Sequence, residues 1–161
     1  SYFYNYDMPV VVTRRCNLYC GTDVNFSRII PNTIRSIFKK KPPVIWKGAE
    51  GFIREFLYVE DAAQAYLSIV ENIEAAKGNA YNIGSGEKIT IKNLVEKLLS
   101  KIPNDLEIQY PSRDFPEINN QYLDSSKIKR ELGWAANTML DEGLDKTIEI
   151  FKQTHFGGQL S

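Results

Sequence analysis

Short apolar segments typical of strands alternate with amphipathic segments typical of helices along the chain, and this alternation limits the possible folds. Residues 9–14 form a β-branched run, which predicts a buried strand. Residues 25–40 carry apolar side chains at helical spacing, which predicts a helix. Strands that alternate with helices favour an α/β fold. The sequence therefore predicts a single compact α/β unit over residues 1–161.

The remaining segments continue this alternation. Residues 1–7 are expected to be the end of a helix or a lead-in to the first strand. Thr90, and either Asp124 or Ser125, are expected to cap the starts of two other helices. Gly133 is expected to end a helix in the left-handed conformation. The other expected elements are strands at residues 44–46, 52–59, 79–83 and 107–110, a helix from residue 60, a helix over 141–153 and a frayed tail at 155–161.

Composition excludes several classes of partner. Lys and Arg total 20, as do Asp and Glu, so the chain has no net charge to attract nucleic acid or an anionic membrane surface. No apolar run approaches the roughly 20 residues that span a bilayer. Cys16, Cys20 and the single His155 are too few for a structural zinc site. Two free thiols fit a reducing compartment, so we expect a cytoplasmic protein without nucleic-acid or membrane partners.

The sequence lacks the motifs that carry common catalytic chemistry. It contains no glycine-rich dinucleotide loop, no P-loop and no tyrosine followed four residues later by lysine. Gly84-Ser85-Gly86 follows a predicted strand but lacks the third glycine, which favours a plain strand-to-helix turn. We therefore predict no catalytic, cofactor-binding or metal-binding residues in this chain.

Arginines at predicted strand ends, helix starts and loops are the candidate ligand-binding residues. Arginine suits bidentate contact with phosphate, and a helix that begins near Asn25 would add free backbone N–H groups. Taken singly, each arginine is more often a surface or ion-pair residue than a ligand residue. This polar set comprises Arg14, Arg15, Asn17, Asn25, Arg28, Arg54 and Arg113.

Six sequence motifs occur in a specific order. They are Pro9-Val10-Val11-Val12-Thr13-Arg14 with Asn17-Leu18-Tyr19, Asn25-Phe26-Ser27-Arg28-Ile29-Ile30-Pro31, Arg54-Glu55-Phe56-Leu57-Tyr58-Val59-Glu60-Asp61, Tyr81-Asn82-Ile83-Gly84-Ser85-Gly86, Asp124-Ser125-Ser126-Lys127 with Leu132-Gly133-Trp134, and Gly143-Leu144 with Lys146-Thr147-Ile148. This order resembles the NAD(P)-dependent nucleotide-sugar 4,6-dehydratase/epimerase family of extended short-chain dehydrogenase/reductases. In that family the residue after the Arg54 position is usually aspartate, whereas this chain has Glu55.

The resemblance implies a domain organisation. The chain would be the C-terminal substrate-binding lobe of such an enzyme, with the last strands and helix of its Rossmann-like sheet. Residues 1–22 and 55–84 would be cofactor-lobe remnants, and residues 23–54 and 85–154 the substrate-binding lobe. The implied partners are a missing N-terminal Rossmann domain, which binds NAD(P) in the parent enzyme, and further copies in a parent homodimer or homotetramer. No tight cofactor binding is expected from this chain alone.

The resemblance also implies roles for six residues. Asn17 would touch the sugar or a phosphate beside the nicotinamide, Asn25 and Arg28 the diphosphate, Arg54 a phosphate or the nucleoside, and Arg113 with Glu117 the diphosphate or ribose. The implied function is binding of a nucleoside-diphosphate sugar as the substrate domain of a 4,6-dehydratase similar to GDP-mannose or CDP-glucose dehydratases. Two alternatives stay open: the substrate domain of a 4-epimerase or reductase, and a stand-alone nucleotide-binding module.

We predict no turnover from this chain alone, because the Tyr-x-x-x-Lys proton-transfer pair of the family is absent from its sequence. The check is incubation with NAD(P)+ and GDP-, CDP-, UDP- and dTDP-hexoses, followed by chromatography of the sugar products. Dehydration of any nucleotide sugar by the isolated chain would contradict this prediction.

Overall fold

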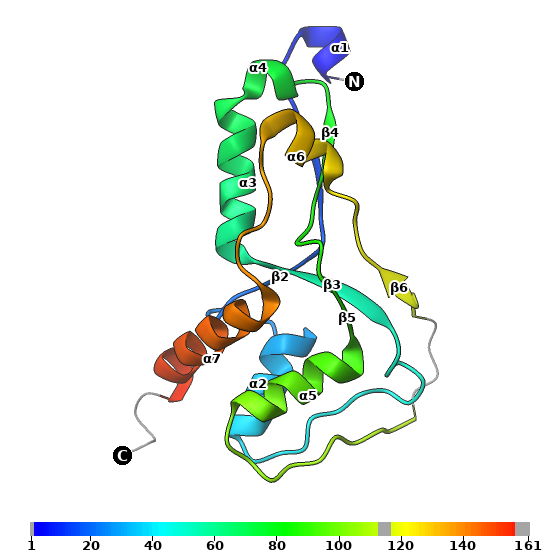
Figure 1. Ribbon diagram of the computed structural model, residues 1–161, viewed down its shortest axis with the longest axis vertical. Coiled ribbons are helices and arrows are strands. Elements are labelled where there is room, and N and C mark those ends of the chain that lie inside the picture. The colour runs from blue at the N-terminus through cyan, green and yellow to red at the C-terminus, as the bar shows by residue number, and fades with distance from the viewer. Residues whose placement is uncertain (1, 113–116, 157–161) are drawn as a thin grey trace.

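A computed structural model describes residues 2–112 and 117–156 (Figure 1). Its elements are α1 (Tyr2–Tyr6), β1 (Val12–Arg15), β2 (Asn17–Tyr19), α2 (Ile29–Phe38), β3 (Ile53–Tyr58), α3 (Val59–Glu71), α4 (Ile73–Ala76), β4 (Ala80–Ile83), β5 (Lys88–Thr90), α5 (Ile91–Lys101), β6 (Asn120–Gln121), α6 (Ser126–Leu132) and α7 (Leu140–Phe156). Strands and helices alternate as the sequence predicts, and the molecule is elongated in this view.

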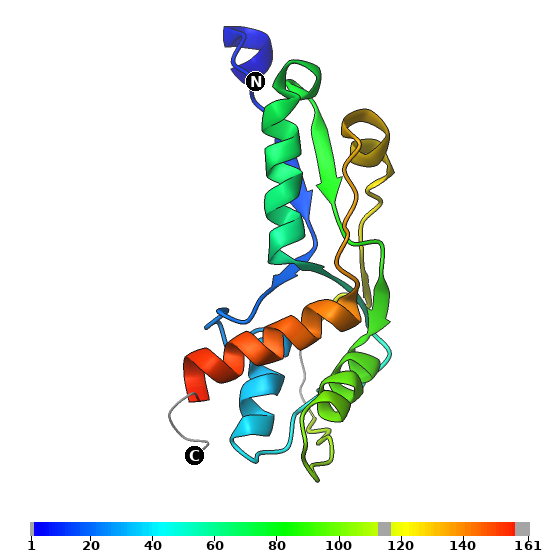
Figure 2. The same ribbon diagram turned by 60° about the vertical axis from the view of Figure 1, so that its left-hand side comes forward.

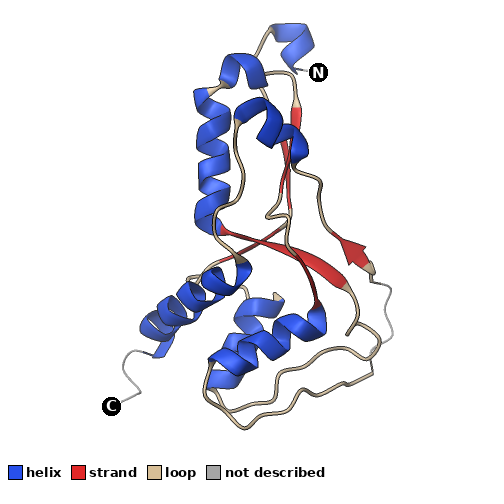
Figure 3. Cartoon of the chain, viewed as in Figure 1, coloured by secondary structure: helices blue, strands red, loops and turns tan. Residues whose placement is uncertain are grey.

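The strands form two small sheets that run from the upper to the middle part of the molecule (Figure 3). β1 pairs with β4 in parallel, with Val12 opposite Ala80. β3 is the centre of the second sheet, because it pairs in parallel with β2 and β6 and antiparallel with β5. β3 therefore links every strand of the second sheet.

One hydrophobic cluster occupies the upper part of the molecule, where α3 and α6 pack with β4. α3 buries Ala62, Ala65 and Ile69 on one face, at helical spacing. Ile128 of α6 and Trp134 join the same cluster. The small alanine side chains allow α3 to approach the strands closely.

A second cluster lies among α2, α5 and α7 at the lower end of the molecule (Figure 2). Ile34, Leu94 and Leu144 each contribute a fully buried side chain, one from each helix. The aromatic rings of Tyr19 and Phe56 extend this cluster to the second sheet. Within the described residues, no helix has both the length and the apolar content needed to cross a bilayer.

Two predicted helix boundaries are confirmed. The Thr90 hydroxyl accepts a hydrogen bond from the Asn93 N–H at 3.2 Å and so caps α5. Gly133 ends α6 with φ of 72°, a backbone conformation that glycine adopts without steric cost. Both signals depend on neighbouring residues along the chain, which is why they could be read from the sequence.

The predicted burial of the strand at residues 9–14 is wrong. β1 begins only at Val12, whose side chain is 56% exposed, and three of its four residues are exposed. Within the described residues β1 pairs with β4 along one edge and has no strand on the other. A β-branched run predicts a strand but cannot supply the neighbours that would bury it.

Other predicted boundaries also need correction. The helix expected from residue 25 begins at Ile29, because residues 23–28 form hydrogen-bonded turns instead. The strands expected at residues 44–46 and 107–110 are reduced to one isolated bridge between Val44 and Gln109. α7 continues to Phe156, so the expected frayed tail is helical at residues 155–156, and residues 157–161 lie outside the described part.

The division into cofactor and substrate lobes stays a prediction. α6, which lies within residues 85–154, packs in the α3–β4 cluster. Tyr19 of β2, which lies within residues 1–22, packs among α2, α5 and α7. The position of an element along the chain therefore does not tell which of the two hydrophobic clusters it joins.

We predict that Gly143→Ala destabilises the fold by about 1–3 kcal/mol through overpacking. A Cβ at Gly143 would overlap the hydroxyl of the buried Tyr19 and lie 2.9 Å from its ring carbon Cζ. This overlap outweighs the roughly 1 kcal/mol that alanine gains over glycine in a helix. Thermal and urea unfolding measure the change in stability.

Two further variants make this test specific. Gly51→Ala is the matched control, because a Cβ there has no atom within 4 Å, and its stability should change by less than about 0.5 kcal/mol. Tyr19→Phe removes the overlapping hydroxyl, so the double variant should recover part of the loss. Equal stability of Gly143→Ala and Gly51→Ala would contradict the predicted contact.

Candidate ligand-binding cavity

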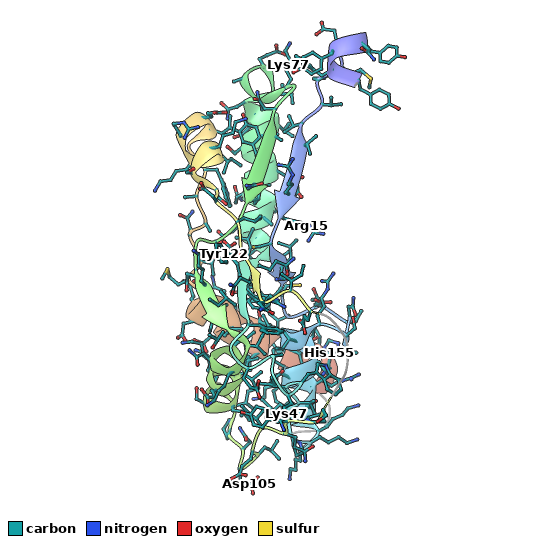
Figure 4. All side chains as sticks on the ribbon, turned by 90° about the vertical axis from the view of Figure 1, so that its right-hand side faces the viewer. Arg15, Lys47, Lys77, Asp105, Tyr122 and His155 are labelled. Carbon is teal, nitrogen blue, oxygen red and sulfur yellow. The ribbon has the colours of Figure 1, made fainter. Side chains whose placement is uncertain are left out.

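A cavity of about 500 Å³ lies beside the second sheet. Its walls come from the end of β1, from β2 and β3, from the start of α2 and from residues 44–49. Arg15, the last residue of β1, is labelled in Figure 4 at mid-height, where the upper strands give way to the lower helices. A volume of this size falls in the range of small-molecule sites, roughly 300–1,000 Å³.

Arg54 is the most firmly held cation in the wall of this cavity. It lies on β3 and is only 7% exposed. Its Nη1 donates to the Ile53 carbonyl at 2.9 Å and to the Asn119 carbonyl at 3.2 Å, and its Nη2 donates to Glu117 Oε1 at 2.8 Å. The pairing of β6 with β3 brings Asn119 and Glu117 to this point.

Arg28 lies at the start of α2, on another wall of the cavity. Its side chain is 52% exposed and pairs with Asp23 at 3.0 Å. Asn25 turns the chain just before this point, because its Oδ1 accepts hydrogen bonds from the N–H and the hydroxyl of Ser27. The turn places Arg28 and the first amides of α2 at the cavity.

Asn17 lies on β2, directly opposite Phe56 of β3 in the strand register. Its side-chain amide donates to the carbonyl of Glu55 at 3.1 Å, which fixes the orientation of the amide beside the cavity. The Asn17 side-chain oxygen can accept a hydrogen bond from a ligand, since only the nitrogen is used in this contact.

The structure brings four of the six predicted binding residues together around one cavity: Asn17, Arg28, Arg54 and Glu117. It does not bring Asn25 to the cavity lining, because that side chain is used in the turn before α2. Arg113 lies outside the described residues. The ligand roles of all six stay predictions.

Several cavity residues were not selected from the sequence. Trp46, 36% exposed, adds an aromatic wall, and Asn32 and Thr33 of α2 add polar groups. A tryptophan at the end of the apolar run Val44-Ile45-Trp46, directly before Lys47-Gly48, is a signal that could have indicated Trp46. Asn32 and Thr33 carry no such signal, because their position depends on where α2 begins.

A buried carboxylate behind the cavity ties three segments together. Glu55 is 1% exposed, and its Oε1 and Oε2 accept hydrogen bonds from the N–H groups of Gly86 and Leu123, both at 2.7 Å. Side chains alternate along a strand, so Glu55 points away from the cavity that Arg54 lines. Any Cβ at Gly84 would meet the Glu55 carboxylate, which requires glycine there.

Cys16 lines the cavity but is not poised as a nucleophile. Burial and, to a lesser degree, the charge of Glu55 raise the pKa of the Cys16 thiol to about 12. The thiol is therefore protonated near neutral pH, whereas the thiolate is the reactive form. Within residues 2–112 and 117–156, no three His, Cys, Asp or Glu side chains gather as metal ligands.

The turn at residues 84–86 does not fit a dinucleotide. The Gly84 N–H donates to Ser125 Oγ at 2.8 Å, and the Gly86 N–H donates to Glu55. These amides hold the fold together and are not available to a cofactor phosphate. The expected strand-to-helix turn needs correction, because residues 84–86 join β4 to the short strand β5 and α5 begins only at Ile91.

Solved structures of nucleotide-sugar enzymes share this fold. A dTDP-glucose 4,6-dehydratase from Bacillus anthracis, solved with NAD, superposes with a TM-score of 0.86 at 22% identity, over 96% of this chain and 48% of that chain. A UDP-glucose 4-epimerase from Thermotoga maritima, solved with UDP-glucose, superposes with a TM-score of 0.86 at 26% identity, over 95% of this chain and 49% of that chain. The architecture is that of extended short-chain dehydrogenase/reductases, of which this chain spans about half.

Sequence comparison identifies the family within that class. A family model described as GDP-mannose 4,6 dehydratase matches residues 1–147. The dTDP-glucose 4,6-dehydratase of Salmonella typhimurium is 35% identical over 155 residues, which cover 91% of this chain and 42% of that enzyme. A trifunctional UDP-glucose 4,6-dehydratase/3,5-epimerase/reductase of Arabidopsis thaliana is 34% identical over 158 residues, 95% of this chain and 23% of that enzyme. The chain belongs to the GDP-mannose 4,6-dehydratase family and spans less than half the length of these relatives.

We predict that Glu55→Gln destabilises the fold by about 1–3 kcal/mol, the cost of leaving a buried polar group unsatisfied. Glutamine keeps the shape but offers one acceptor oxygen, so its NH₂ group faces either the Gly86 or the Leu123 N–H. Thermal unfolding measures the loss. The exposed Glu107→Gln removes the same charge and should leave stability within about 0.5 kcal/mol. Equal melting temperatures for the two variants would refute a structural role for the Glu55 carboxylate.

Proposed function

We propose that this chain binds a nucleoside-diphosphate sugar as the substrate domain of an NAD(P)-dependent nucleotide-sugar 4,6-dehydratase. The observation that carries the proposal is the convergence of Arg15, Arg28 and Arg54 on one cavity with an aromatic wall. The chain has no net charge, so this local group of cations is what would attract an anionic ligand. Membership of the GDP-mannose 4,6-dehydratase family supports the substrate class.

The chemistry of the cavity suits both ends of such a ligand. Guanidinium groups bind phosphate oxygens in a bidentate manner, and α2 directs free backbone N–H groups from its first turn toward an anion. Trp46 brings an aromatic ring to the cavity wall, which suits an aromatic nucleobase, and Asn17 offers hydrogen bonds to a sugar hydroxyl. The chain itself would contribute recognition and orientation.

The proposed partner is an N-terminal Rossmann domain that holds NAD(P) and the proton-transfer residues. Two observations support a partner of this kind: β1 pairs along one edge within the described residues, and its Val12 side chain is 56% exposed. DesIV of Streptomyces venezuelae, a dTDP-glucose 4,6-dehydratase with the same fold, was solved with NAD. The parent enzyme would be a homodimer or homotetramer. The two free thiols are in keeping with a cytoplasmic location.

A 4-epimerase is the second candidate within the same class. The superposition on the UDP-glucose 4-epimerase of Thermotoga maritima favours it as strongly as the dehydratase superposition does, at a TM-score of 0.86. The closer sequence match to dehydratases favours the first candidate. The sugar product of the chain joined to its cofactor domain separates the two, because only a dehydratase forms a 4-keto-6-deoxy sugar.

A stand-alone nucleotide-binding module is the third candidate. Such a module would have to stay monomeric in solution. The exposed edge of β1 and the exposed apolar side chains of α3, such as Leu67 and Val70, favour association instead. Light scattering distinguishes the cases, since a monomer at high concentration would favour the module.

We predict that one of GDP, CDP, UDP and dTDP raises the melting temperature of this chain by several degrees, and that Arg54→Ala removes the shift. A ligand at about 100 times its Kd stabilises the folded state by about 2.7 kcal/mol. Arg54 is buried and fixed at the cavity, so its loss removes a pre-positioned cation. Differential scanning fluorimetry with each nucleotide is the measurement.

Arg130→Ala is the matched control for this test. Arg130 lies on α6, away from the cavity, and its side chain is 67% exposed. Its substitution removes the same charge as Arg54→Ala does, so the shift in melting temperature with nucleotide should persist. Indifference of the wild-type chain to all four nucleotides would count against a preformed site. A shift that Arg54→Ala and Arg130→Ala reduce equally would mean that binding is not centred on Arg54.

A further inference from the structure

The guanidinium of Arg54 has few donors left for a ligand. Both hydrogens of Nη1 have backbone acceptors, the carbonyls of Ile53 and Asn119. These two bonds fix the plane of the group, because the guanidinium is rigid and flat. Any anion that contacts Arg54 must therefore be bound through Nη2 and Nε. Nη2 is the atom that already donates to a carboxylate.

Glu117 supplies that carboxylate, at 2.8 Å from Nη2. The Arg54 side chain is 9% exposed and that of Glu117 is 32% exposed, so solvent screens this ion pair only in part. Both residues line the cavity. The carboxylate therefore takes up one of the three N–H donors that Arg54 has left for a phosphate oxygen.

The second arginine of the cavity that carries a carboxylate partner differs in exposure. The Arg28 side chain is 52% exposed, so it keeps donors that face water, whereas its partner Asp23 is only 10% exposed. Asp23 is also held in place by the N–H of Asn25. Arg54 is therefore the arginine whose own guanidinium is buried, and its carboxylate partner, Glu117, is the more exposed of the two carboxylates.

We propose that Glu117 is an internal counter-ion that occupies Arg54 in the empty cavity and is displaced when a diphosphate binds. The proposal rests on the function proposed above and names the residue that limits its affinity. A poorly solvated guanidinium without an anionic partner is destabilising, so Glu117 stabilises the ligand-free fold. Displacement then favours an anion that offers several oxygens at once, as a diphosphate does, over an anion with a single contact.

The test is titration of the full chain with inorganic pyrophosphate, monitored by calorimetry or NMR. Glu117→Gln keeps the side-chain shape and removes the competing charge, so pyrophosphate should bind about three- to tenfold more tightly than to wild type. Glu107→Gln removes the same charge from an exposed position and should leave Kd within about twofold. Glu117→Ala serves as a second variant with the same expected direction.

The Arg54→Ala background decides whether the effect acts through Arg54. The gain from Glu117→Gln should vanish there, because the competition that it relieves no longer exists. A gain that persists without Arg54 would indicate a general field effect and overturn the proposal, as would unchanged or weaker binding to Glu117→Gln. If Arg54→Ala alone binds pyrophosphate as tightly as the wild type does, the binding function proposed for this cavity fails instead.

Discussion

The buried carboxylate of Glu55 is the contact on which the arrangement of the cavity depends. It accepts hydrogen bonds from the N–H groups of Gly86 and Leu123, which are 31 and 68 residues away in the sequence. A carboxylate that is 1% exposed is tolerated only when its oxygens are hydrogen-bonded, so the fold must keep both contacts. They hold the start of β5 and the segment after β6 against β3. The backbone carbonyl of Glu55 accepts a hydrogen bond from the side-chain amide of Asn17.

The alternation of side chains along β3 divides them between the cavity and the opposite side of the sheet. Arg54 and Phe56 line the cavity, whereas Glu55 and Leu57 point to the opposite side, where Leu57 joins the α3–β4 cluster. Parallel pairing with β2 sets Asn17 opposite Phe56, and pairing with β6 sets Gln121 opposite Arg54. Changes on one face of this strand are therefore expected to shift residues on the other face.

Charge in the cavity is offset only in part, in a chain whose overall charge is zero. Arg54 and Arg28 each have a carboxylate partner, Glu117 and Asp23, and the two ion pairs differ in which partner is buried, the arginine in the first and the aspartate in the second. The Glu117 carboxylate avoids the cost of an unpaired buried cation at Arg54. Under the proposed function, an anion with more oxygens than one carboxylate, such as a diphosphate, would replace this partner.

The sequence by itself determined what depends on neighbouring residues: the alternation of strands and helices, the Thr90 cap, the left-handed Gly133 and the ordered motifs of the family. Tertiary structure alone decided which side chains meet. The Arg54–Glu117 ion pair joins residues 63 positions apart, and the approach of Trp46 to the same cavity has no local cause. The exposure of β1 was likewise undetermined, because local periodicity specifies a strand but not the elements that pack on it.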